Sequence, residues 1–248
     1  AGGIRGSSRV VPPIGPRAAM PTGPRDRHPE RGALPGGSPV VSGVEAGMRP
    51  AGQNFARVKG AYDLGAMARS RVIGVGVGGA APWYEDMARA GIGEFVLIDP
   101  DVVSETNLAT QQVYRRDLGR PKVSCVAERI RDINPEAVIW EIPRGLDHLS
   151  DAMMRFLTFG MLESRQASRT LLCGFTDNFE AQARINRLAL HFGVPSLCAQ
   201  VYREGRGAEI TFTYPGMTPA CHRCALGGRY RAILGGGGVD EVTSDGTP

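Results

Sequence analysis

The fold of this chain is decided by residues 69–101, which read RSRVIGVGVGGAAPWYEDMARAGIGEFVLIDPD. Apolar residues dominate 71–75 and again 94–99, and between them lie a glycine-rich segment and a stretch with helical periodicity over 81–90. This order predicts a strand, a tight turn, a helix and a second strand. It is typical of nucleotide-binding α/β proteins, in which the turn after the first strand faces the phosphates.

The glycines of this turn fit two registers. Residues 74–79 read G-x-G-x-x-G, which is typical of nicotinamide or flavin sites, whereas residues 76–81 read G-x-G-G-x-A, a form met where the ligand is ATP. If Gly76 opens the turn, the strand before it has the usual length of about five residues. If Gly74 opens it, little more than Val72 and Ile73 remains. We therefore favour the Gly76 register, with Gly74 inside the strand at a mild cost.

The rest of the chain continues the alternation of helices and strands. Residues 53–70 predict one amphipathic helix or two short ones, and later segments predict helices over 120–132, 150–164 and 178–192 and strands over 137–142, 170–175, 195–201 and 208–214. This alternation predicts an α/β fold, with a Rossmann-like, doubly wound, mostly parallel sheet and flanking helices.

Residues 1–50 differ in composition from the rest of the chain. They contain ten glycines, nine prolines and seven arginines against three acidic residues, without apolar periodicity. We expect a disordered tail over 1–50 and one nucleotide-binding domain over 51–248. The tail contributes the whole net charge of +4, so a basic nucleic-acid face on the folded part is not indicated. Because the chain begins with Ala1 and ends at Pro248 without a closing element, we expect a fragment of a longer protein.

Five cysteines suggest a reducing cytoplasm rather than a disulfide framework. No apolar run approaches the roughly 18 residues of a membrane span. Cys221-x-x-Cys224 supplies two of the four thiolates of a structural zinc site, so we expect a small zinc-binding element at the C-terminal side, completed by cysteines beyond Pro248. An unpaired remnant or a redox pair is the alternative. Cys125, Cys173 and Cys198 lie in helix or strand patterns, as small core residues do.

Polar residues follow the second strand. Asp99 ends it about twenty residues after the turn, the placement expected of an acid that binds ribose hydroxyls. Asp101, Asn107, Gln111 and Lys122 come next. Acids, amides and a lysine near a phosphate loop suit a triphosphate with a cation better than a nicotinamide ring. The alternatives are a solvated charged loop and a purely structural turn.

A second acidic position follows the strand predicted over 170–175. Asp177 and Asn178 would lie at the carboxyl end of a parallel strand, where ligands of such sheets bind. Mg²⁺ prefers one or two carboxylates together with phosphate oxygens. The alternative is that Thr176, Asp177 or Asn178 caps the following helix, and both roles can hold together.

Residues 53–226 resemble the ThiF/MoeB/HesA adenylyltransferases, the bacterial relatives of ubiquitin-activating enzymes. The matching segments, in chain order, are the glycine turn, ARAGIG (88–93), LIDPDVV (97–103), NLATQQ (107–112), GRPK (119–122), INPEA (133–137), FTDNFEAQARIN (175–186), ITFTYPG (210–216) and CHRC (221–224). Because these motifs are collinear, the resemblance is specific for the fold, and it favours ATP over a dinucleotide as the ligand of the turn.

The resemblance implies a set of site residues and a reaction. The phosphates would contact Gly76, Gly78, Gly79, Asn107, Gln111 and Lys122. The ribose would contact Asp99, which lies beside Asp101, and Mg²⁺ would be held by Asp177 with support from Asn178. Arg57 would be lent to the site of the other subunit in a homodimer. The implied reaction is the activation of a substrate carboxylate as an acyl-adenylate with release of pyrophosphate. The usual substrate is the Gly-Gly C-terminus of a ubiquitin-like sulfur carrier, although some members act on peptides or a modified tRNA. The near-neutral core gives no support to the tRNA option.

Two departures from the family pattern affect these expectations. Thr110 stands where the family's N-L-x-R-Q loop has an arginine, so that charge is lost unless Arg115 or Arg116 replaces it. Between Ala225 and Pro248 there is no further cysteine for a thioester or persulfide step. The main hypothesis is an adenylating enzyme. The rivals are a non-catalytic relative that binds a nucleotide or a partner protein, and a dinucleotide oxidoreductase that uses the Gly74 register.

Overall fold

A computed structural model of the chain describes residues 55–61, 63–160, 169–202 and 207–234. The tail predicted over 1–50 lies outside the described residues, so it stays a prediction. Within the described part, no helix is both long enough and apolar enough to cross a membrane.

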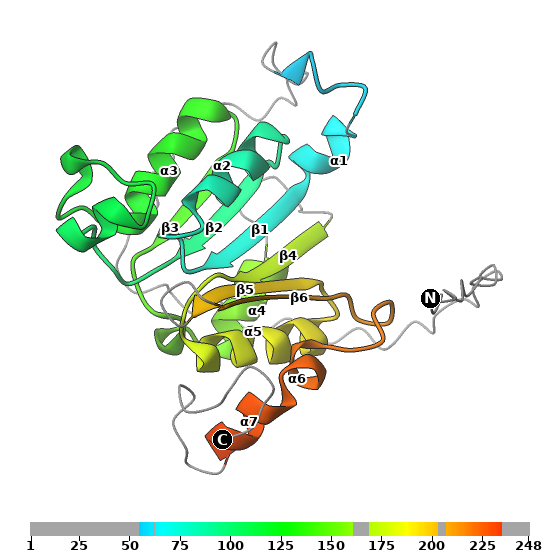
Figure 1. Cartoon of the computed structure of the whole chain (residues 1–248). Coiled ribbons are helices and arrows are strands. Elements are labelled where there is room, and N and C mark those ends of the chain that lie inside the picture. Colours follow the sequence, from blue (N-terminus) through cyan, green and yellow to red (C-terminus); the bar gives the residue numbers. More distant parts are fainter. Residues whose placement is uncertain (1–54, 62, 161–168, 203–206, 235–248) are drawn as a thin grey trace, which may run out of the picture. The chain divides into compact units, whose positions relative to one another are not determined.

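The centre of the fold is a six-stranded sheet (Figure 1). Its strands are β1 (Ser70–Val75), β2 (Glu94–Ile98), β3 (Val138–Ile142), β4 (Arg169–Gly174), β5 (Ser196–Tyr202) and β6 (Gly207–Thr213). They are arranged in the order β3-β2-β1-β4-β5-β6, and only β6 runs antiparallel to its neighbour. The chain order reverses between β1 and β4, and ligands of such sheets bind at the carboxyl ends of the strands beside this point.

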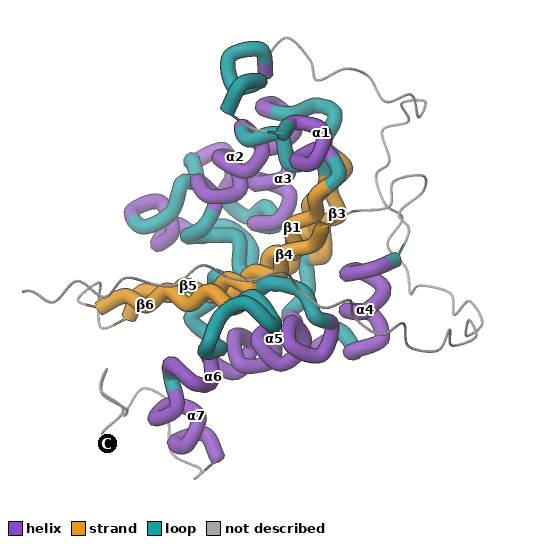
Figure 2. The backbone as a smooth tube through the Cα atoms, turned by 90° about the vertical axis from the view of Figure 1, so that its right-hand side faces the viewer, coloured by secondary structure: helices purple, strands orange, loops and turns teal. Residues whose placement is uncertain are grey.

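Helices cover both faces of the sheet, as the predicted doubly wound fold requires (Figure 2). They are α1 (Leu64–Ala68), α2 (Ala81–Arg89), α3 (Lys122–Ile133), α4 (Asp151–Phe159), α5 (Phe179–Phe192), α6 (His222–Ala225) and α7 (Gly227–Leu234). The pair α2 and α3 packs on one face, and the pair α4 and α5 packs on the other. The predicted class of fold is confirmed.

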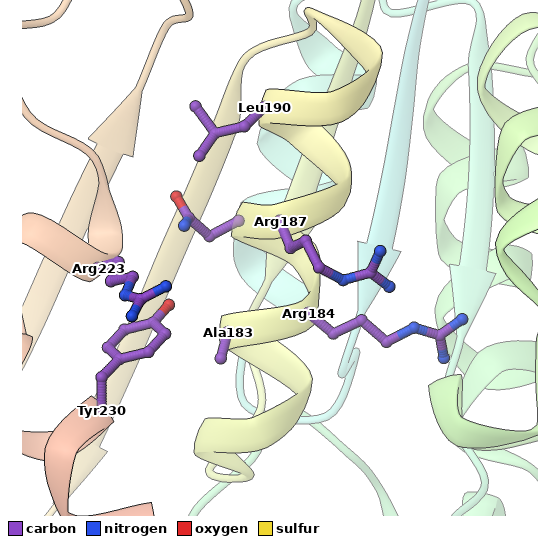
Figure 3. Close-up of a pocket in the computed structure, with 7 residues that line it drawn as sticks. Ala183, Arg184, Arg187, Leu190, Arg223 and Tyr230 are labelled. Carbon is purple, nitrogen blue, oxygen red and sulfur yellow. The ribbon is translucent and has the colours of Figure 1, made fainter. Parts of the chain in front are cut away.

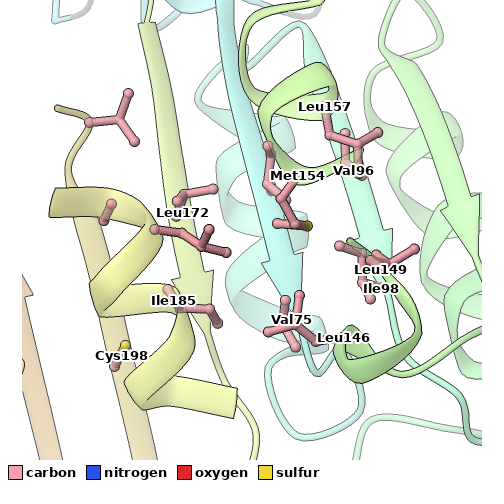
Figure 4. Close-up of a cluster of buried hydrophobic side chains, with 14 residues drawn as sticks. Val75, Val96, Ile98, Leu146, Leu149, Met154, Leu157, Leu172, Ile185 and Cys198 are labelled. Atoms are coloured by element: carbon pink, nitrogen blue, oxygen red, sulfur yellow. The ribbon is translucent and has the colours of Figure 1, made fainter. Parts of the chain in front are cut away.

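Alternate residues of the central strands point to opposite faces and pack into separate cores. Ile73 and Val75 of β1 pack with residues of α4 and α5, including Met154 and Ile185 (Figure 4). Val72 packs on the other side with residues of α2 and α3. Each such side chain stabilises the fold by about 1.5–3 kcal/mol when fully buried. Burial on both faces explains why these strands read as continuous apolar runs.

The helix predicted over 150–164 is shorter than expected, and this boundary was wrong. Helix α4 ends at Phe159, and Gly160 adopts an extended conformation. At this end of the helix the buried guanidinium of Arg71 donates to the carbonyl oxygens of Leu157 at 2.8 Å and Gly160 at 3.2 Å. Arg71 is itself paired with the buried Glu94 at 2.9 Å. A side chain from a distant strand therefore occupies carbonyls that the helix would otherwise leave without partners.

Candidate nucleotide-binding site

The glycine turn adopts the Gly76 register. Strand β1 continues to Val75, and Gly76 has a φ of 83°, a conformation that residues with a Cβ rarely adopt. A Cβ on Gly76 would also lie 2.5 Å from the carbonyl oxygen of Phe175. Both observations require glycine at the first position of G-x-G-G-x-A, and they favour the prediction made from strand length.

Gly74 has a different role, which the sequence did not reveal. A Cβ at this position would lie 2.0 Å from the hydroxyl oxygen of Tyr84, a fully buried residue of α2. That hydroxyl donates to the carbonyl oxygen of Gly76 at 3.0 Å, and burial raises the pKa of Tyr84 well above its usual value, so the donor keeps its proton. A glycine inside a strand signals close approach of another group. Here the group is a tyrosine that braces the turn.

Of the two glycines in the second half of the turn, Gly79 is exposed, whereas Gly78 is buried beside the Gln111 side chain. Apart from its chain neighbours, no heavy atom of the described residues lies within 4 Å of the position that a Cβ on Gly79 would occupy. A Cβ on Gly78 would lie 2.4 Å from Oε1 of Gln111, and this buried oxygen has no hydrogen-bond partner among the described residues. An amide oxygen only accepts hydrogen bonds, so this atom requires a donor, and only the Nε2 end of Gln111 can donate to a phosphate.

Asp99 joins the glycine turn to the loop that follows β2. Its Oδ2 accepts from the backbone nitrogen of Val77 at 2.9 Å, and its Oδ1 accepts from the backbone nitrogen of Asp101 at 2.9 Å. An ionised carboxylate has about four acceptor positions, so capacity for a ribose hydroxyl remains. The first role of this buried carboxylate is nevertheless to hold two loops together.

Lys122 begins α3, with its ammonium group largely buried. Nζ of Lys122 pairs with Oδ2 of Asp101 at 2.8 Å, and the backbone nitrogen of Lys122 donates to the carbonyl oxygen of Asp101 at 2.9 Å. An ammonium group has three donors, so Asp101 positions the lysine without using all of them.

The loop between β2 and α3 contains a 3-10 helix, η2 (Glu105–Ala109). Oδ1 of Asn107 accepts from the backbone nitrogen of Ser104 at 2.9 Å and so caps this helix, while the side-chain nitrogen of Asn107 has no partner among the described residues. Thr110, the replacement for the family's arginine, ends η2 and is exposed.

Of the two roles considered for this turn, Asn178 is the helix cap, and Asp177 is left available as a metal ligand. Oδ1 of Asn178 accepts from the backbone nitrogen of Ala181 at 2.9 Å, so Asn178 is the N-cap of α5. Asp177 is exposed, and its carboxylate has no partner among the residues that the structure describes. A free carboxylate at the end of a parallel strand is suited to a divalent cation beside phosphate oxygens.

The strand order brings these groups to one edge of the sheet. Asp99 follows β2, the glycine turn follows β1, and Asp177 follows β4, and these three strands are adjacent and parallel. Arg57 is not brought to this edge within one chain. It is exposed in the turn formed by 55–61, which packs near the start of β2 at the opposite edge.

The two cysteines of C-x-x-C form only part of a metal site. Their sulfur atoms lie 3.7 Å apart. Burial alone would raise the pKa of the Cys221 thiol, but hydrogen bonds with Cys224 and the Arg223 backbone lower it overall. Among the described residues there is no group of three or more cysteine, histidine or acidic side chains that could hold a metal ion. Zinc therefore stays a prediction that needs ligands from outside the described residues.

A groove of about 450 Å³ lies on the outer side of α5, facing α6 and α7 (Figure 3). Its lining residues are Ala183, Arg184, Asn186, Arg187, Leu190, Arg223 and Tyr230. None of the residues predicted for the nucleotide site lines it. The guanidinium groups of Arg184 and Arg187 turn toward α4, where both pair with Asp151, so this groove is not the phosphate site.

A model of the ThiF family matches residues 52–234 of the chain. The chain belongs to the ThiF family. Among curated proteins, it is 28% identical over 163 residues to the SAMP-activating enzyme E1 of Haloferax volcanii, covering 64% of this chain and 54% of that protein. It is 32% identical over 163 residues to the molybdopterin-synthase adenylyltransferase of Salmonella typhimurium, covering 64% of this chain and 59% of the relative.

A solved structure also shares the fold. The structure of E. coli MccB with ATP has a TM-score of 0.57 and 20% sequence identity, covering 75% of this chain and 55% of that one. At this identity the likeness concerns the fold alone. The chain spans little more than half the length of these relatives. The family membership confirms the resemblance drawn from the nine motifs.

Proposed function

We propose that this ThiF-family chain binds ATP and transfers its adenylyl group to a substrate carboxylate, giving an acyl-adenylate and pyrophosphate. The observation that supports this most directly is the convergence of the glycine turn, Asp99 and Asp177 at the ends of three adjacent parallel strands. The names of the curated relatives, an activating enzyme and an adenylyltransferase, agree with this reaction class.

Each group has a distinct part in the proposed reaction. The backbone of Gly76, Gly78 and Gly79 would lie along the phosphates, and Asp99 would meet the ribose while it holds the turn. Asn107 and Gln111 would donate amide hydrogens, and Asn178 would fix the corner of the site. A substrate carboxylate is already anionic and needs no general base, so catalysis depends on positioning and charge neutralisation.

Lys122 and Asp177 would supply the charge. Lys122, held by Asp101, would stabilise the negative charge that grows on the departing pyrophosphate. Asp177 would hold Mg²⁺, which neutralises phosphate charge when bound. Losing the arginine at position 110 removes a contact that can be worth a few kcal/mol, roughly the 2.7–4 kcal/mol of one preorganised donor.

We further propose a ubiquitin-like or sulfur-carrier protein with a Gly-Gly C-terminus as the acyl substrate. The exposed sheet face formed by β5 and β6 offers an apolar surface for such a protein, because Val201, Ile210 and Phe212 are 65%, 74% and 53% exposed. Arg57 at the opposite edge could reach a site only in a second copy, which agrees with a homodimer.

Magnesium-dependent exchange of pyrophosphate into ATP tests this function. Candidate carriers that end in Gly-Gly should stimulate exchange, and the same carriers without the last glycine should not. Asp177→Ala should abolish exchange while the unfolding midpoint stays unchanged, since its exposed side chain makes no contact that the fold needs. Lys122→Ala should lower kcat more than it weakens ATP binding. Normal exchange by Asp177→Ala would refute the assignment.

A second candidate follows from Thr110. A family member that binds nucleotide without catalysis would retain Mg²⁺-dependent ATP binding and show no exchange with any carrier. Replacing Thr110 by arginine then separates the two functions. In an enzyme the change should raise the exchange rate, and in a pure binder it should leave the rate at zero.

A further inference from the structure

Gln182 of α5 connects the Asp177 turn to the interior. The side chain is 1% exposed, and its Nε2 donates to the carbonyl oxygen of Thr176 at 2.6 Å and to Oε1 of Gln200 at 3.3 Å. The carbonyl of Thr176 belongs to the same peptide group as the backbone nitrogen of Asp177. Gln182 therefore fixes the plane of the peptide from which Asp177 projects.

His222, the second residue of C-H-R-C, completes this contact from the other side. Its Nε2 lies 3.2 Å from Oε1 of Gln182, and its Nδ1 lies 2.9 Å from the hydroxyl oxygen of Tyr230 in α7. Because the Gln182 amide nitrogen already donates twice, its oxygen must accept, so His222 donates from Nε2. Nδ1 of the neutral ring then accepts from Tyr230. Each donor and acceptor has one consistent assignment.

A second branch anchors the network at the edge of the sheet. Nε2 of Gln200 donates to Glu209 of β6, and Glu209 pairs with Arg229 of α7. Every buried side-chain nitrogen and oxygen of the three residues Gln182, Gln200 and His222 has a hydrogen-bond partner. A buried polar network that is fully satisfied is rigid and favours one arrangement, whereas a partly satisfied one would be costly.

We infer that the chain Tyr230–His222–Gln182 is a positioning relay that sets the orientation of the Asp177 carboxylate. The backbone of the turn is fixed by the relay while the Asp177 carboxylate stays free for a ligand. Through the relay, α7 and the C-x-x-C segment hold the turn that contains Asp177. This inference rests on the proposed function, in which Asp177 holds Mg²⁺.

The test measures cation binding and backbone dynamics rather than turnover. Mn²⁺ binding to the full chain with a non-hydrolysable ATP analogue is followed by electron paramagnetic resonance, and hydrogen exchange is followed over residues 175–181. Gln182→Met should weaken Mn²⁺ binding about tenfold, and Tyr230→Phe about threefold, as expected when groups that orient a ligand are lost. Both variants should exchange faster at 175–181.

Two matched controls separate positioning from general stability. Tyr214→Phe deletes the same atom as Tyr230→Phe at a partly exposed tyrosine outside the relay. Thr170→Val removes a buried hydrogen bond to the carbonyl oxygen of Thr158 at the other end of β4, and so destabilises the fold away from the turn. Neither control should change Mn²⁺ binding or exchange at 175–181 in the folded protein.

Asp177→Asn distinguishes failure of the relay from failure of the proposed function. If Asp177→Asn weakens Mn²⁺ binding but Gln182→Met changes neither binding nor exchange, the relay is overturned and the metal assignment stands. If Asp177→Asn leaves Mn²⁺ binding unchanged, the metal assignment fails, and the relay then orients no ligand, which overturns the inference also. Weaker Mn²⁺ binding in Thr170→Val equal to that in Gln182→Met would likewise overturn it.

Discussion

Replacing Asp99 by asparagine tests whether this carboxylate holds the two loops together. In the native chain both oxygens accept a backbone hydrogen bond at 2.9 Å, from Val77 and from Asp101. An asparagine can accept on one side only. Because the nitrogen of Val77 is buried and that of Asp101 is closer to solvent, we expect the amide oxygen to face Val77.

The expected magnitude follows from the groups left without partners. A buried donor that loses its acceptor costs about 1–3 kcal/mol, and a hydrogen bond to a charged group contributes about 1.5–3 kcal/mol. Asp99→Asn should therefore lower the free energy of unfolding by about 2 kcal/mol, and Asp99→Ala, which leaves both donors without an acceptor, by about 4 kcal/mol. Urea unfolding measures both values.

Hydrogen exchange adds a local readout to this experiment. The backbone amide of Asp101 should exchange faster in Asp99→Asn while that of Val77 stays protected, and both should exchange faster in Asp99→Ala. The control is Asp132→Asn, the same chemical change at an exposed position of α3, which should alter stability by less than about 0.5 kcal/mol. Equal stability of Asp99→Asn and the native chain would refute the reasoning.

Three further perturbations address the turn, the buried ion pair and the relay. Gly74→Ala should cost about 1–3 kcal/mol through overlap with Tyr84, and a compensating Tyr84→Leu should recover part of the loss, as urea unfolding of the double variant would show. Arg71→Met should cost about 3–5 kcal/mol because it leaves the charge of Glu94 buried and removes the cap of α4; a calorimetric scan without a lowered midpoint would contradict this. Burial and the nearby charge of Arg229 lower the pKa of His222 from 6.5 to about 4, so the unfolded chain takes up its proton first as the pH falls. The contribution of neutral His222 to the free energy of unfolding is thus fully present above pH 6.5 and decreases by up to about 3 kcal/mol toward pH 4. His222→Gln should flatten that part of the profile of unfolding free energy against pH.

The sequence predicted those parts of the fold and site that depend on local pattern. Strand length indicated that Gly76 opens the turn, and the alternation of helices and strands indicated a mostly parallel sheet. A helix cap at Thr176, Asp177 or Asn178 was considered as the alternative to a metal site, and Asn178 is that cap. These features depend on the residues next to them, so a single sequence is sufficient to find them.

The features that were missed depend on contacts between residues far apart in the chain. Arg71 binds carbonyls at the end of α4 from 86 residues away, and Gln182 meets His222 across a separation of 40 residues. No periodicity or motif reports such pairs. The tyrosine behind Gly74 belongs to the same class, although a glycine inside a strand was a usable sign that a bulky group lies against it.

The two backbone hydrogen bonds that Asp99 accepts have a consequence for redesign of the chain. Because one carboxylate binds the backbone on both sides, the turn after β1 and the loop after β2 form a single rigid block. A graft that exchanges only one of these loops for the loop of a homologue would disturb one of the two hydrogen bonds that the carboxylate accepts. The smallest transplantable unit for altering this candidate site is therefore the pair of loops moved together with their shared aspartate.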